Sequence, residues 1–380
     1  MKEIYENKNL RILYFIGIFL VVANHFGGGS INLLYDWFPA YSFHLPLFMF
    51  CSGYLIFKNR SEKTLPFLKK NLKKFLIPLY VWNIIYGLFI IFLHHKGFTI
   101  GDSFNLFNIF IKPIYNGHQF VFTLATWYIF PLLILKIINF FILKLLGDDK
   151  KLYVLYFFIS LLIGALGIHL AMNGYNEGFY LLLVKIMFFL PFFAFGMLYF
   201  VVLERYDKFR NLVYFALLFI ISLIVIYIFG GTKEYVPSWC NNFDNVYRPY
   251  IVGLIGILFW LRVAKIITPV LSKSKFIMNI SRNTYDIVIH HMMGYFILNC
   301  IYYKLSNIMF HDFNIESFKS NIFYFYTPKG LNNFLILYVV FGFGFSLTII
   351  YIKKLIKKKI DERRFVIWNM DYYIIKIPII

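Results

Sequence analysis

The chain has 380 residues, of which 60% are hydrophobic, 22% are aromatic and only 15% are charged. Soluble globular domains carry about 25% charged residues and far fewer aromatic ones. This composition excludes an ordinary soluble enzyme and predicts an all-α polytopic integral membrane protein. The net charge of +20 must be interpreted from its distribution, because basic residues beside apolar spans orient a membrane protein.

About ten apolar stretches recur along the chain, and most are long enough to cross roughly 30 Å of hydrocarbon as helices. In chain order they are 11–28, 43–57, 75–94, 126–146, 152–171, 179–202, 211–230, 249–264, 283–303 and 332–352. The first stretch is not followed by a small-residue cleavage site, so we expect it to be retained as a signal anchor.

The basic residues gather in alternate connecting segments, above all in 58–74 and in 353–359. Because Lys and Arg are retained on the cytoplasmic side, this pattern predicts that both ends of the chain are cytoplasmic. The positive charge then orients the protein and attracts anionic lipids of the bilayer. It requires no nucleic acid as a partner.

No linker, internal repeat or second globular domain is visible, so we expect one transmembrane domain over residues 1–364. The last residues, FVIWNMDYYIIKIPII (365–380), are apolar and aromatic but too short to span comfortably. Trp368, Tyr372 and Tyr373 favour a position for this tail at the cytoplasmic membrane interface.

Titratable side chains inside predicted spans are costly to insert, which makes them candidates for function. His25 follows Arg11 by fourteen residues, or about 21 Å of helix, so His25 lies in the outer half of the first span and Arg11 at its inner end. His44 lies at the outer start of the second span. A histidine near a helix end can also serve only to hydrogen bond a carbonyl group, and His44 is more open to that interpretation than His25.

Four further titratable residues lie within later spans. His290 and His291 are adjacent on the ninth, so their side chains point about 100° apart and only one readily faces a given cavity. Lys136 on the fourth and Lys185 on the sixth can instead extend along their own stems towards the membrane surface.

The sequence does not favour a metal site. The histidines have no i, i+4 spacing on one helix and no carboxylate beside them. Cys51, Cys240 and Cys300 are too few and too scattered to form a disulfide framework or a thiolate metal site.

Six blocks of sequence together resemble the membrane-bound acyltransferase family 3, which includes bacterial polysaccharide and O-antigen O-acetyltransferases. The blocks follow the family's order and extend over nearly the whole chain. They are IFLVVANH (18–25), FHLPLFMFCSGYLIF (43–57), FLKKNLKKFLIPLY (67–80), TWYIFPLLIL (126–135), FFAFGML (192–198) and SRNTYDIVIHHMM (281–293). The resemblance implies a membrane O-acetyltransferase of the cell envelope.

The chain departs from the family pattern at three places. Many members carry an arginine eleven residues before the first histidine, where this chain has Tyr14; Arg11 lies one turn lower and would substitute only in part. The entry to the third span uses lysines in place of arginines, which lose the bidentate fork but keep the charge. No esterase-like domain follows the last span, so we expect any such activity to come from a separate envelope-glycan protein.

The resemblance implies that an acyl donor, acetyl-CoA in the first instance, approaches from the cytoplasm and that the acyl group reaches a carbohydrate hydroxyl facing outwards. The expected donor site is a set of four lysines at the inner surface, whose charge also fits simple membrane orientation. These are Lys69, Lys70, Lys73 and Lys74.

His25 is the expected catalytic group, as the base that removes a hydroxyl proton or as a transient acyl carrier. Arg11, His290 and His291 are further catalytic candidates. Supporting roles are expected for His44, Ser52, Trp127 and Lys185, although Ser52 also fits simple helix packing. No resident cofactor is expected, only acyl-CoA as donor substrate.

Two other functions fit the same sequence features. A transporter of polysaccharide or lipid-linked sugar would also have about ten spans, with intramembrane His and Lys forming a proton relay. A non-catalytic membrane assembly protein would need His25 only for stability.

Overall fold

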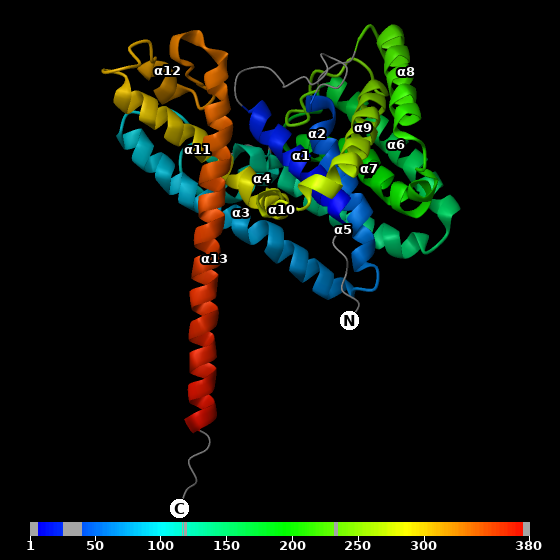
Figure 1. Cartoon of the computed structure of the whole chain (residues 1–380), viewed down its shortest axis with the longest axis horizontal. Helices are drawn as coiled ribbons and strands as arrows, with labels where there is room; N and C mark the ends of the chain where they lie inside the picture. The colour runs from blue at the N-terminus through cyan, green and yellow to red at the C-terminus, as the bar shows by residue number, and fades with distance from the viewer. Residues whose placement is uncertain (1–6, 26–39, 116, 118–119, 232–234, 375–380) are drawn as a thin grey trace, which may run out of the picture.

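In the computed structural model, the described residues are 7–25, 40–115, 117, 120–231 and 235–374, with side chains as far as residue 361. They form helices almost throughout, and the one strand-like pairing among them is an isolated antiparallel bridge between Val236 and Asn241. The long helices pack side by side into one bundle (Figure 1). The chain is therefore all-α, as its composition predicts.

The longer helices correspond one by one to the ten predicted spans. They are α1 (Lys8–Asn24), α2 (Ala40–Leu55) extended by η2 (Ile56–Asn59), α3 (Thr64–His95), η4 (Val121–Tyr128) continued by α5 (Ile129–Leu146), α6 (Lys150–Met172), α7 (Gly178–Leu198) extended by η5 (Tyr199–Leu203) and η6 (Glu204–Tyr206), α8 (Asn211–Phe229), α9 (Arg248–Leu271), α11 (Thr284–Leu305) and α13 (Leu335–Ile374).

Shorter helices connect them: η3 (Phe107–Ile111), α4 (Lys112–Tyr115), α10 (Lys275–Arg282), α12 (Ile315–Ser320), η7 (Pro328–Gly330) and η8 (Asn332–Phe334).

Eight helical segments in the described part of the chain are long and apolar enough to cross a membrane. Two helices that the sequence predicts as spans, α1 and α11, are not among these eight. Helix α1 has 17 residues, and residues 26–28 of the predicted span lie outside the described residues. Polar side chains, among them Asp286 and the histidine pair, lower the mean hydropathy of α11. The protein is a multi-pass membrane protein, and the count of ten spans stays a prediction.

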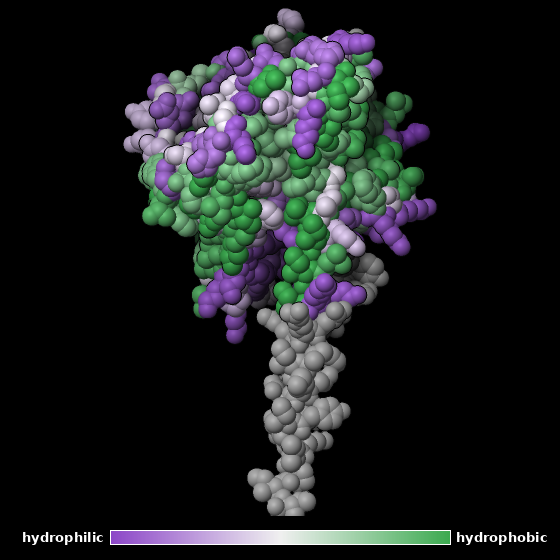
Figure 2. Space-filling model, turned by 90° about the vertical axis from the view of Figure 1, so that its left-hand side faces the viewer, coloured by the Kyte–Doolittle hydropathy of each residue, from purple (hydrophilic) through white to green (hydrophobic). Residues whose placement is uncertain are grey.

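The distribution of hydropathy on the surface fits a bilayer. Figure 2 shows hydrophobic residues as a band across the body of the molecule, with hydrophilic residues gathered at its upper and lower ends. The first residues of α1 and the last residues of α13 lie on the same lower side in Figure 1. The placement of both chain ends on the cytoplasmic side of the membrane stays a prediction.

Helices α2 and α7 approach each other closely because two glycines face the opposite backbone. A Cβ atom on Gly53 would lie 2.0 Å from the carbonyl oxygen of Phe193, and one on Gly196 would lie 2.0 Å from that of Phe50. Small residues of this kind let membrane helices pack backbone to backbone. The contact fixes α2, which carries His44 and Ser52, against the centre of the bundle.

Helix α13 continues without a break from Leu335 to Ile374, across the predicted boundary at residue 364. It packs along α11 and then projects from the bundle (Figure 1). Residues 375–380 of the predicted tail lie outside the described residues, and the interfacial position of the tail stays a prediction.

Candidate active site

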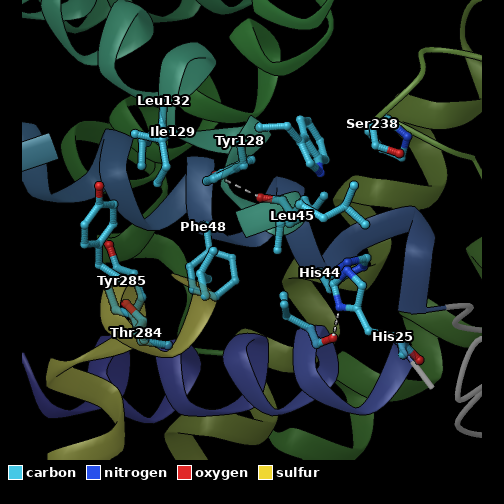
Figure 3. Close-up of a pocket in the computed structure, with 18 of the residues that line it drawn as sticks. His25, His44, Leu45, Phe48, Tyr128, Ile129, Leu132, Ser238, Thr284 and Tyr285 are labelled. Carbon is cyan, nitrogen blue, oxygen red and sulfur yellow. Dashed lines mark hydrogen bonds between the residues drawn. The ribbon is translucent and has the colours of Figure 1, made fainter. Parts of the chain in front are cut away.

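A cavity of about 770 Å³ runs through the bundle beside α1. Its walls come from α1, α2, α3, η4, α5, α10 and α11, together with residues 235–242 and two phenylalanines near residue 324. Figure 3 shows His25 and His44 at one end, Thr284 and Tyr285 at the other, and Phe48 between them. The cavity therefore joins the predicted outer half of the bundle to its predicted inner half.

His25 is the C-cap residue that follows α1, and it lines the outer end of this cavity. Its Nδ1 lies 2.7 Å from the carbonyl oxygen of Val21, one turn earlier on the same helix. A carbonyl only accepts hydrogen bonds, so Nδ1 must carry the proton and, in the neutral ring, Nε2 keeps its lone pair. The helix thus fixes the tautomer in which the Nε2 atom of His25 can accept a proton.

His44 and His291 have the same tautomer for the same reason. The Nδ1 atom of His44 lies 2.6 Å from the Ala40 carbonyl oxygen, and that of His291 lies 2.9 Å from the Ile287 carbonyl oxygen. His44 lines the cavity, whereas His291 is fully buried behind His25, with the two ring centroids 5.0 Å apart. The Nε2 atom of His291 has no hydrogen-bond partner among the described residues.

His290 points away from this group, towards α3. Its Nδ1 lies 2.7 Å from the hydroxyl oxygen of Tyr86, and its ring centroid is 4.2 Å from that of Trp82. Neither His290 nor His291 lines the cavity. The adjacent histidines therefore have different surroundings, and only His291 contacts His25.

The inner end of the cavity is basic. Arg11, Lys74, Lys136 and Arg282 all line it, and no Asp or Glu belongs to its lining among the described residues. The ammonium groups of Lys74 and Lys136 lie 5.6 and 5.5 Å from the same ring centroid, that of Phe75. Cations that converge without a lining carboxylate favour an anionic ligand.

A family model for an acyltransferase domain matches residues 7–355, which is nearly the whole chain. The chain belongs to acyltransferase family 3. Comparisons with curated proteins and with solved structures found no significant match. The match covers every helix that lines the cavity, so the site described above lies within the acyltransferase domain.

Within this acyltransferase domain, the two candidates on α1 lie where the sequence places them. Arg11 lines the inner part of the cavity and His25 the outer part. Tyr14, three residues after Arg11 on the same helix, lines the same cavity. Arg11 also lies 3.4 Å, through Nη1, from the carbonyl oxygen of Ser281. Arg11 therefore reaches the cavity although it lies about one turn before Tyr14 on α1.

Of the four lysines predicted to bind the donor, Lys74 lines the cavity and the other three do not. Lys69 and Lys73 are exposed on α3. Lys70 is 2.5 Å from a carboxylate oxygen of Glu62 and 3.2 Å from the side-chain oxygen of Asn59. The structure instead adds Lys136 and Arg282 to Lys74. The sequence marks Lys136 only as an intramembrane lysine and Arg282 only by its place in the block SRNTYDIVIHHMM (281–293).

Some of the predicted supporting residues line the cavity and others do not. Ser52 and Trp127 line the cavity. Lys185 is buried and does not line it, but its ammonium group lies 4.7 Å from the Trp127 ring centroid, where it packs against the wall of the cavity. The supporting role of Lys185 stays a prediction.

The sequence marks residues 231–248 only as a long outer loop, rich in Asn and aromatic residues, that could cover a pocket. In the structure the part of this loop that lines the cavity is the turn formed by residues 235–242. Tyr235, Ser238, Trp239 and Asn242 from this turn line the cavity. Cys240 lies behind them, fully buried, and burial raises the pKa of its thiol to about 12. Apolar periodicity carries no information about a turn, so the sequence does not show which residues of this loop face the cavity.

Proposed function

We propose that the protein is an O-acyltransferase of the bacterial plasma membrane. It moves an acyl group, with acetyl as the expected one, from a cytoplasmic acyl-CoA to a hydroxyl of an extracytoplasmic or lipid-linked carbohydrate. The observation that supports this most strongly is one cavity with four cations at its predicted inner end and proton-accepting histidines at the other.

The donor fits the inner end by charge. Acetyl-CoA carries several phosphate charges at one end and its thioester at the other, joined by a narrow pantetheine arm. Arg11 and Arg282 offer planar guanidinium forks and Lys74 and Lys136 offer point charges, which are the groups that bind phosphate in proteins. His25 follows Arg11 by about 21 Å of helix, a distance comparable with the reach of that arm.

The reaction at the outer end needs one proton acceptor. In the proposed step the acceptor hydroxyl oxygen attacks the thioester carbonyl carbon while Nε2 of His25 takes the hydroxyl proton. The carbon–sulfur bond then breaks, and the CoA thiolate takes the proton back from the imidazolium. Atoms and charge balance without a metal or a redox cofactor. Nε2 is also the atom that would carry the acyl group if His25 acted as a nucleophile.

Family membership favours this function over a transporter of lipid-linked sugar. The acceptor is expected to be an envelope glycan, such as exopolysaccharide, capsule or O-antigen, made and presented by separate envelope-glycan proteins. The lipid bilayer is the remaining partner, and nucleic acid has no part in the proposal.

A sided assay tests this function. Purified protein in proteoliposomes receives acetyl-CoA labelled in the acetyl group on one side and uncharged oligosaccharides on the other. We expect label to appear in the saccharide with the parent protein and with His95→Ala, whose histidine is exposed at the end of α3. We expect none with His25→Ala. Movement of saccharide across the membrane without consumption of acetyl-CoA would support the transporter instead.

A further inference from the structure

The outer end of the cavity is lined by aromatic side chains from segments distant in the sequence. Tyr41 and Trp127 come from α2 and η4, Trp239 comes from the turn 235–242, and Phe323 and Phe325 come from the segment before α13. Trp239 and Phe323 remain 43% and 46% exposed although both line the cavity. Large aromatic side chains that stay accessible in a concave site are typical of ligand binding.

The turn 235–242 holds Trp239 in place at a conformational cost. The bridge between Val236 and Asn241 closes it, and two of its non-glycine residues adopt positive φ angles, 45° at Cys240 and 66° at Asn242. Such angles are uncommon and costly outside glycine, and they cluster at functional sites. The Cys240 side chain is buried with Ala171, Leu181 and Val184, which anchors the turn to α6 and α7.

Tyr235, at the start of this turn, carries a polar group that lacks a partner. Its side chain is 1% exposed and its ring lies 5.6 Å from that of Phe243 at an angle of 27°. The hydroxyl group is buried and forms no hydrogen bond with any described residue. Burial raises the pKa of this hydroxyl, so it stays neutral. Buried hydroxyl groups are nearly always hydrogen bonded, which indicates a partner supplied by a ligand or by water.

The charge at this end differs from that at the inner end. The four cations that line the cavity belong to the inner half, and the outer lining contributes hydroxyl, amide, imidazole and aromatic groups. Figure 3 shows Ser238 of the turn at the same end as His25 and His44. A ligand held here must offer an apolar face for the rings and neutral hydroxyl groups for hydrogen bonds. A pyranose ring has both.

We infer that residues 235–242 form the acceptor-binding turn, in which Trp239 stacks on the face of an uncharged pyranose residue and Tyr235 hydrogen bonds one of its hydroxyl groups. The inference rests on the proposed function, because the bound sugar is the group that His25 deprotonates. It adds the element that selects the acceptor, which is separate from the groups that bind the donor.

Steady-state kinetics with soluble uncharged oligosaccharides test the acceptor-binding turn. Trp239→Ala should raise the KM for the acceptor at least about ten-fold, as expected for an aromatic side chain that a bound ligand covers, and Trp239→Phe should restore most of the loss. Tyr235→Phe should raise it about three- to ten-fold, since one neutral hydrogen bond is lost. The KM for acetyl-CoA should stay at the parent value. The rate at which the enzyme transfers the acetyl group to water in the absence of a saccharide should also be unchanged.

Tyr247→Ala is the matched control, because Tyr247 is a 62% exposed aromatic just beyond the turn and does not line the cavity. It should behave as the parent. If Trp239→Ala keeps the parent's acceptor KM, or changes acetyl-CoA hydrolysis as much as transfer, the acceptor-binding turn is refuted. If Trp239→Ala lowers transfer only to lipid-linked acceptors, the aromatic rings bind a lipid chain and the inference is also wrong.

The two proposals fail in different ways. A parent protein that acylates no saccharide at all would overturn the proposed function and the acceptor-binding turn together. If the parent protein acylates saccharides and the variants keep its KM for the acceptor, only the assignment of the acceptor-binding turn is overturned.

Discussion

Replacing Lys74 and Lys136 together by glutamine should strongly reduce the protein's preference for a donor with phosphate groups. Both ammonium groups lie within 6 Å of the Phe75 ring centroid at the inner end of the cavity. A hydrogen bond between charged groups contributes about 1.5–3 kcal/mol, so two would contribute about 3–6 kcal/mol. Lys74 is exposed to solvent although it lines the cavity, and solvent screens its charge and favours the lower value. We therefore expect kcat/KM for acetyl-CoA to fall about 10²-fold.

The assay compares acetyl-CoA with S-acetylpantetheine, which has the same thioester and arm but no phosphate. In the double variant the preference for acetyl-CoA over S-acetylpantetheine should shrink by about the same factor of 10², because two of the four cations that recognise phosphate are lost. Lys69→Gln and Lys73→Gln are the controls, since both lysines are exposed on the same helix and do not line the cavity. Equal losses in the controls, or an unchanged preference in the double variant, would refute this assignment of the donor site.

Three further predictions concern stability and topology. Gly196→Ala should lower the melting temperature in detergent, because its Cβ would meet the Phe50 backbone. Gly344→Ala should not, because the space around its Cβ is open. Equal melting temperatures of the two variants would contradict the close contact of α2 with α7. Cys240 should resist maleimide until the protein unfolds, since burial raises the pKa of its thiol to about 12 and shields it; rapid labelling of the folded protein would show the turn to be open. Cysteines introduced at the exposed positions Lys69 and Tyr247 should be labelled from the inner and outer sides respectively, and labelling of both from one side would overturn the predicted topology.

The sequence was sufficient for the fold class and for the residues placed by helix geometry. Ten apolar stretches correspond to ten long helices, since a span of this length has few other ways to satisfy its backbone in lipid. Arg11 and His25 line one cavity because both lie on α1 with a fixed rise between them. These inferences need no knowledge of how the helices pack.

The sequence was insufficient wherever packing between distant segments decides the site. Four neighbouring lysines look alike in the sequence, yet only Lys74 lines the cavity, and its companion Lys136 comes from a different helix. The difference between His290 and His291 depends on which helix each faces, α3 or α1. Trp239 lines the cavity because a strained turn presents it, and no periodic pattern predicts such a turn.

The central claim is that Nε2 of His25 acts on the acyl-transfer step, and one measurement tests it most directly. Acetyl transfer to an uncharged oligosaccharide is compared between the parent and His25→Gln, which keeps hydrogen bonding but does not take up a proton. General base catalysis typically contributes 10²- to 10⁴-fold, so transfer should fall by about that factor while acetyl-CoA binding stays intact. His95→Gln should match the parent. Transfer by His25→Gln at close to the parent rate would show that His25 does not handle the proton or the acyl group.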